Sequence, residues 1–248
     1  MNTLPQTQRH PQDLATAKYL LSHNCVKFAP ANYIYAIEAH TKEEKLAATS
    51  IFISSILGRC DFGIMSESKP PQTIIYYCTA DEDYSIFCTM LQMLDTKQSK
   101  HFHIINLQNY NKSMRLQYIM QDMAHYRPTH IFIDGLKVFC QDFNSQEEST
   151  ELIEILAQSA TKYQCGIWCV LHLNPNNEKM RGHLGTELEN KAADIFYTSK
   201  DNDHFVLRHE ASRHQEIDDI LFRIENPKGR RAEVPVPCLK VTPTCIRH

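Results

Sequence analysis

Residues 33–57 read YIYAIEAHTKEEKLAATSIFISSIL and decide how the chain folds. Residues 33–38 form an apolar run typical of a strand, and residues 42–57 repeat apolar side chains at helical spacing. The same alternation continues downstream, with strands expected over 73–79, 103–107, 130–134 and 166–172 and helices over 84–94, 113–126 and 147–163. Strands that alternate with helices favour an α/β fold whose mainly parallel sheet is flanked by helices.

The two ends of the chain depart from this alternation. A short helix over 187–192 and short strands over 195–198, 204–209 and 220–224 predict an antiparallel C-terminal extension of the same sheet. A helix is also expected over residues 11–22, and the prolines after residue 226 favour an extended end. We therefore expect an N-terminal helical extension (1–30), a core domain (31–226) and an extended C-terminal tail (227–248).

Composition excludes several classes of protein. The chain has only seven glycines in 248 residues, none before Gly58, which is under half the usual ~7%. This argues against a glycine-rich nucleotide loop in the N-terminal quarter. With 26 basic and 29 acidic residues the net charge is −3, so any nucleic-acid binding needs a local patch or an assembled surface. Nine cysteines without a C-x-x-C pair indicate reduced thiols in a cytoplasmic protein, and no membrane segment is expected.

The junction at residues 38–46 lies where an α/β phosphate-binding protein carries its G-x-x-x-x-G-K-[ST] loop. If Lys45 is aligned with the lysine of that motif, Ala39 and Glu44 fall at the glycine positions and Leu46 at the hydroxyl position. Thr41 and Glu44 instead have the spacing of a capping box, which would place a carboxylate where a phosphate otherwise binds. The alternative interpretation is a well-capped helix in an unrelated protein.

Acidic residues follow two of the expected strands. Asp134 ends the run 131–134 in the manner of a Walker B aspartate, which holds Mg²⁺ or its water. Asp81 and Glu82 follow the strand at 73–79, where a carboxylate can polarise an attacking water. A turn aspartate and a solvated helix start, respectively, are the alternatives.

The most specific stretch begins at the strand-ending His172. Residues 179–194 read KMRGHLGTELENKAAD, so that a polar loop carries basic side chains between glycines, a composition suited to following a phosphate backbone. The candidate contacts are Asn174, Lys179, Arg181 and His183. A solvated loop is the alternative. A second basic run, at residues 228–231, is either surface charge or a nucleic-acid contact.

Residues 30–225 resemble RecA-like ATPases of the RepA hexameric-helicase type. In particular, they resemble those carried on mobile elements of Bacteroides-like bacteria. The features that carry this resemblance are the 179–194 run, His172 and the Ser212-Arg213 pair. The resemblance implies a RecA-like core that forms rings or filaments with nucleotide between subunits. If the protein is active, the resemblance assigns catalytic roles to Asp81, Glu82, Asp134 and His172. It implies that Asp134 binds Mg²⁺ and that Lys45, Thr41 and Arg213 bind the nucleotide.

Together these observations predict a degenerate RecA/RepA-like protein that oligomerises and binds nucleic acid, with single-stranded DNA as the expected partner. The expected setting is mobile-element DNA replication, recombination or transfer, with weak or no ATP hydrolysis. One alternative is an active ATP- and Mg²⁺-dependent helicase or translocase with a non-standard phosphate loop. The other is a structural or regulatory protein-interaction module on the same fold.

Overall fold

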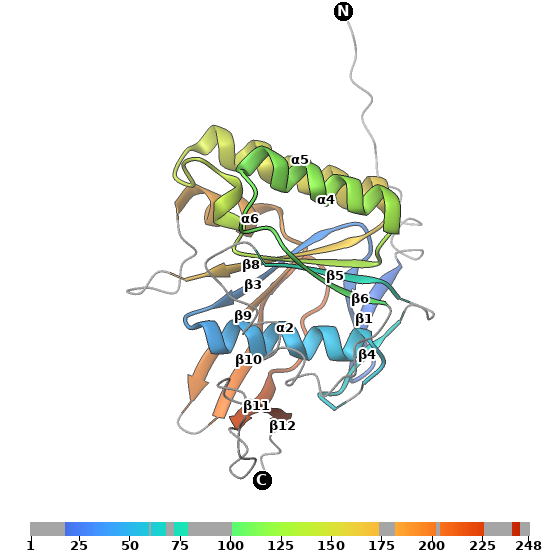
Figure 1. The fold of residues 1–248 in the computed structure, drawn as a ribbon. Helices are drawn as coiled ribbons and strands as arrows, with labels where there is room; N and C mark the ends of the chain where they lie inside the picture. The colour runs from blue at the N-terminus through green and yellow to red at the C-terminus, as the bar shows by residue number, and fades with distance from the viewer. Residues whose placement is uncertain are drawn as a thin grey trace, which may run out of the picture.

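The computed structural model describes residues 18–59, 61–67, 72–78, 101–173, 182–201, 204–225 and 240–243. Nine strands form one sheet in the order β12-β11-β10-β9-β3-β8-β7-β5-β6 (Figure 1). They are β3 (Ile34–Ala39), β5 (Ile74–Cys78), β6 (Phe102–Asn106), β7 (His130–Asp134), β8 (Gly166–His172), β9 (Asp194–Asp201), β10 (His204–Ser212), β11 (Ile220–Glu225) and β12 (Lys240–Pro243). Strands β9, β3, β8, β7, β5 and β6 pair in parallel, and β10, β11 and β12 continue antiparallel from β9. The predicted fold class is therefore confirmed.

Helices cover both faces of this sheet (Figure 1). Helices α4 (Lys112–Tyr126), α5 (Gln146–Tyr163) and α6 (Gly182–Lys191) lie on one face, and α2 (Lys42–Ile56) lies on the other. Helix α5 is amphipathic and buries residues such as Leu152 and Leu156 against the sheet. None of the helices in the described part of the chain is both long and apolar enough to cross a bilayer.

Helix α2 is buried on all sides, because a second, three-stranded sheet also packs against its core. This sheet has the order β2-β1-β4 and is formed by β1 (Tyr19–His23), β2 (Val26–Pro30) and β4 (Ile64–Ser66). The helix expected over residues 11–22 is thus wrong for 19–22, while residues 1–17 lie outside the described part. Asn24 and Cys25 both have positive φ, 47° and 68°, as a tight hairpin turn requires, and neither is glycine.

Two further expectations concern the C-terminal third. Helix α6 begins at Gly182, five residues before the expected start at residue 187. Most of the 179–194 run therefore belongs to this helix. Within the expected tail, β12 is extended and pairs with β11, so part of that tail belongs to the main sheet. The helix expected over 84–94 lies outside the described residues.

Asp194, the last residue of the 179–194 run, ties three segments together. Its carboxylate accepts hydrogen bonds from the Ala29 amide (3.0 Å), the Ser212 hydroxyl (2.7 Å) and His209 Nε2 (3.0 Å). The Ile217 amide donates to His209 Nδ1 at 3.1 Å, so Nε2 is the nitrogen that carries the proton toward Asp194. These bonds hold the small sheet and β10 against the start of β9.

Trp168 lies at the centre of the core below α2. Its ring stacks on Phe132 with 10° between the planes, and its Nε1 donates to His130 Nδ1 at 3.2 Å. Burial lowers the pKa of His130 to about 3, which keeps the imidazole neutral.

Candidate functional site

A cluster of polar side chains lies at the carboxyl edge of the parallel strands, where ligands of open α/β sheets bind. Lys45 Nζ lies 2.7 Å from Asp134 Oδ1, and both side chains are almost fully buried, at 4% and 3% exposed. His172 Nε2 lies 3.4 Å from the same Nζ. The hydroxyl of Tyr76 donates to Asp134 Oδ2. Three strands and one helix thus meet at a single buried ion pair.

Sheet order explains why these residues meet although they lie far apart in the chain. Strand β8 lies between β3 and β7, and β5 follows β7. His172 ends β8 and Asp134 ends β7, whereas Lys45 stands in the first turn of the helix that follows β3. The parallel direction of the strands brings all their carboxyl ends to one edge.

Helix α2 begins with the predicted capping box. The Thr41 hydroxyl accepts a hydrogen bond from the Glu44 amide at 3.2 Å. Glu44 Oε2 reaches back and accepts from the amides of His40 (3.1 Å) and Thr41 (3.4 Å). The Glu44 side chain is buried, at 5% exposed. The amides at this junction therefore donate to a carboxylate of the chain itself. In a phosphate-binding loop, the amides at the same position donate to the nucleotide.

The residues present do not fit a nucleoside triphosphate with Mg²⁺ in this arrangement. Glu44 brings negative charge to the helix N-terminus, and Leu46 has no hydroxyl for a metal. The ammonium of Lys45 is bound to the carboxylate of Asp134. Within the described residues, no group of three or more His, Cys, Asp or Glu side chains is arranged to hold a metal ion.

Glu38 is a further buried carboxyl group, and it faces α6 on the side of the sheet opposite the Lys45–Asp134 pair. It lies on β3 between β8 and β9 and is 5% exposed. Burial, with smaller contributions from the carboxylates of Glu189 and Glu210, raises the pKa of Glu38 to about 8. Sequence reasoning treated Glu38 only as the start of the junction, although an acid inside an apolar strand was the available signal.

The remaining predicted site residues fall into two groups. Arg213 lies away from the ion pair, and its guanidinium donates to the carbonyls of Ala192 (3.0 Å) and Asn190 (2.6 Å) at the end of α6. His183 is exposed in the first turn of α6. The residues that lie outside the described part of the chain are Asp81, Glu82, Asn174, Lys179 and Arg181.

The start of α6 is fixed by close packing at Gly182. This residue has φ +69°, and an added Cβ would meet Asn144 Oδ1 at 2.6 Å and the Phe143 carbonyl oxygen at 2.8 Å. The Leu184 amide donates to that same carbonyl at 3.1 Å. Only glycine lets α6 start this close to residues 143–144.

A solved structure shares this architecture. The chain is similar to a KaiC-like protein from the hyperthermophilic archaeon Pyrococcus horikoshii, with a TM-score of 0.56 and 14% sequence identity over 81% of this chain and 88% of that one. No family model matches the chain, and no curated protein matches its sequence. The similarity and the sheet order together define a RecA-like fold.

Proposed function

We propose that this protein is a RecA-like subunit with a degenerate phosphate-binding loop. It oligomerises and binds nucleic acid, with weak or no ATP hydrolysis. The observation that carries the proposal is the position of Glu44, whose carboxylate accepts hydrogen bonds from the amides of His40 and Thr41. The ion pair between Lys45 and Asp134 supports it from the other side of the same site.

The energetic argument concerns what a triphosphate has to displace. Phosphoryl transfer depends on amides, a lysine and Mg²⁺ that neutralise the charge developing on the phosphate. Here the γ-phosphate has to expel the Glu44 carboxylate and separate Lys45 from Asp134, a pair that is 2.7 Å apart and shielded from water. A buried charge that loses its partner without gaining another costs about 3–5 kcal/mol, so the phosphate and its metal have to replace both partners of the pair.

The nucleic-acid part of the proposal rests on the loop between β8 and α6. His172 marks where the loop leaves the sheet and Gly182 marks where it enters α6. The residues proposed to contact single-stranded DNA are Asn174, Lys179, Arg181 and His183. Assembly into a ring or filament, and a role in mobile-element DNA replication, recombination or transfer, are proposed on the resemblance of the 179–194 run.

A protein-interaction module without nucleic-acid binding is the second candidate, because the capping box fits it equally well. The two are separated by fluorescence anisotropy of a labelled single strand, titrated with the protein at several salt concentrations. Our proposal expects salt-sensitive binding together with weak or no ATP affinity by calorimetry. Folded protein that binds no nucleic acid at low salt supports the second candidate instead.

A further inference from the structure

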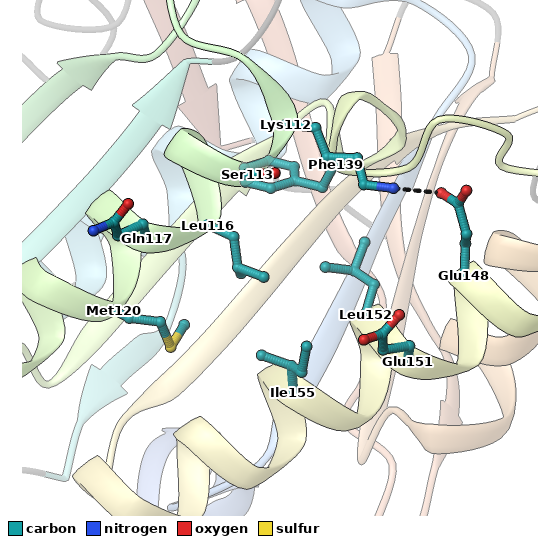
Figure 2. Close-up of a pocket in the computed structure, with 10 residues that line it drawn as sticks. All are labelled: Lys112, Ser113, Leu116, Gln117, Met120, Phe139, Glu148, Glu151, Leu152 and Ile155. Carbon is teal, nitrogen blue, oxygen red and sulfur yellow. Dashed lines mark hydrogen bonds and ion pairs between the residues drawn. The ribbon is translucent and has the colours of Figure 1, made fainter.

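A groove of about 450 Å³ opens between α4 and α5 (Figure 2). Its floor is apolar and is formed by Leu116 and Met120 of α4 with Leu152 and Ile155 of α5. The volume is that of a site for a small ligand or a few side chains of a peptide.

The rim of the groove is acidic. At one end Lys112 Nζ binds Glu148 Oε2 at 2.8 Å, so this cation is already neutralised (Figure 2). Glu151 also lines the groove, is exposed and makes no ion pair within the described part of the chain. An occupant with apolar side chains and at least one cation complements this surface.

Residues 226–239 of the chain have this composition. They read NPKGRRAEVPVPCL, with cations at Lys228, Arg230 and Arg231 against a single acid, followed by alternating valine and proline. The valine, proline and leucine side chains of this segment are apolar, as is the floor of the groove. None of the assigned functions uses this segment.

The sheet topology disfavours docking of residues 226–239 into the groove of the same molecule. The segment joins the end of β11 at Glu225 to the start of β12 at Lys240, at the edge of the sheet far from α4 and α5 (Figure 1). Three strand spacings separate β11 from β3 and four separate it from β8, the two strands that α5 contacts, which is about 14 and 19 Å. A loop of 14 residues tethered at both ends extends at most about 24 Å outward. That leaves about 5–10 Å of reach for crossing over to the groove between the helices.

We propose that residues 226–239 of one copy dock into the α4–α5 groove of a second copy, with Arg230 or Arg231 meeting Glu151. The contact is head-to-tail, because groove and segment lie on different parts of the molecule. It therefore propagates into a ring or a filament. The inference rests on the oligomerisation in the proposed function and names the surfaces that carry it.

Two charge-reversal variants test the contact by light scattering after size exclusion. Glu151→Arg damages only the groove, and Arg230→Glu/Arg231→Glu damages only the segment, so each variant alone is expected to run as a monomer. Mixing the two is expected to restore oligomers, because the new cation in the groove of one variant meets the new carboxylates in the segment of the other, and the remaining groove and segment are both wild type. Glu154→Arg is the matched control, since Glu154 is an exposed acid of α5 that does not line the groove.

A peptide of residues 226–239 gives an independent readout. It is titrated against the full-length Arg230→Glu/Arg231→Glu protein, whose groove has no competing segment. Adding Glu151→Arg is expected to raise the dissociation constant about tenfold, whereas adding Glu154→Arg leaves it within about twofold.

The outcomes separate this inference from the proposed function. A wild-type oligomer whose mass neither variant changes overturns the docking contact and leaves the proposed function standing. A wild-type protein that stays monomeric at all concentrations overturns the proposed oligomerisation as well. Loss of DNA binding in Arg230→Glu/Arg231→Glu without loss of mass identifies the segment as a nucleic-acid contact and also overturns the docking contact.

Discussion

Lys45 Nζ lies 2.7 Å from Asp134 Oδ1 in a site from which water is excluded. The lysine belongs to the helix after β3 and the aspartate to the end of β7, two positions that in a phosphate-binding α/β protein face a nucleotide and its metal. In this chain they bind each other, and Tyr76 satisfies the second oxygen of the carboxylate. The pair thereby links the first turn of α2 to the end of β7.

Removing one partner of this pair is expected to destabilise the fold. Lys45→Met should lower the free energy of unfolding by about 3–5 kcal/mol, because it leaves Asp134 buried without its counter-ion. The double variant Lys45→Met/Asp134→Asn should recover most of that loss. Urea unfolding followed by circular dichroism measures both, and strictly additive losses in the double variant contradict the ion-pair account.

Glu44→Gly should restore one glycine of a phosphate loop and release the amides of His40 and Thr41. We expect the variant to lose about 1 kcal/mol of stability with its cap and to gain affinity for pyrophosphate by calorimetry. Glu43→Gly is the control, because Glu43 stands in the same helical turn but is exposed. Equal pyrophosphate binding by both variants, or by neither, argues against Glu44 as the occupant of the amides.

Glu38 should make stability fall as pH rises. The folded state keeps the proton on this carboxyl up to about pH 8, whereas the unfolded chain releases it near 4.5. The contribution is therefore fully present below pH 4.5 and is lost as the pH rises through 8. Glu38→Gln should show a stability advantage over wild type that grows across this window by an amount on the order of 5 kcal/mol. A stability advantage of Glu38→Gln that does not change with pH would show that Glu38 does not titrate in this window.

Gly182→Ala should damage the entry of the loop into α6. Both the φ of +69° and the contacts with residues 143–144 oppose a side chain, so a loss of about 2 kcal/mol or more is expected in thermal unfolding. Gly58→Ala is a matched control, with φ +94° but open space around its Cβ position. Equal losses in the two variants show that the packing against residues 143–144 contributes nothing.

The local parts of the site were predictable from sequence. The capping box depends on Thr41 and Glu44, which are three residues apart, and Asp134 and His172 follow apolar runs that end where the structure ends β7 and β8. The ion pair was not predictable, because it depends on the order of strands in the sheet. The β1–β2 hairpin escaped notice because its turn uses Asn24 and Cys25 at positive φ instead of glycine.

Lys179→Ala/Arg181→Ala should reduce the slope of log affinity for single-stranded DNA against log salt by about two, because each lost phosphate contact removes about one counter-ion. Lys162→Ala, an exposed lysine on α5, is the control. An unchanged slope in the double variant would place the contacts elsewhere.

The central claim is that Glu44 and the Lys45–Asp134 pair occupy the site in which a RecA-like ATPase binds its nucleotide. ATP turnover with Mg²⁺, measured with and without single-stranded DNA, tests it most directly, with Asp134→Ala assayed in parallel. The account predicts turnover at or only slightly above the level of the buffer control for both proteins. Robust Mg²⁺-dependent turnover by the wild type that Asp134→Ala abolishes would contradict it.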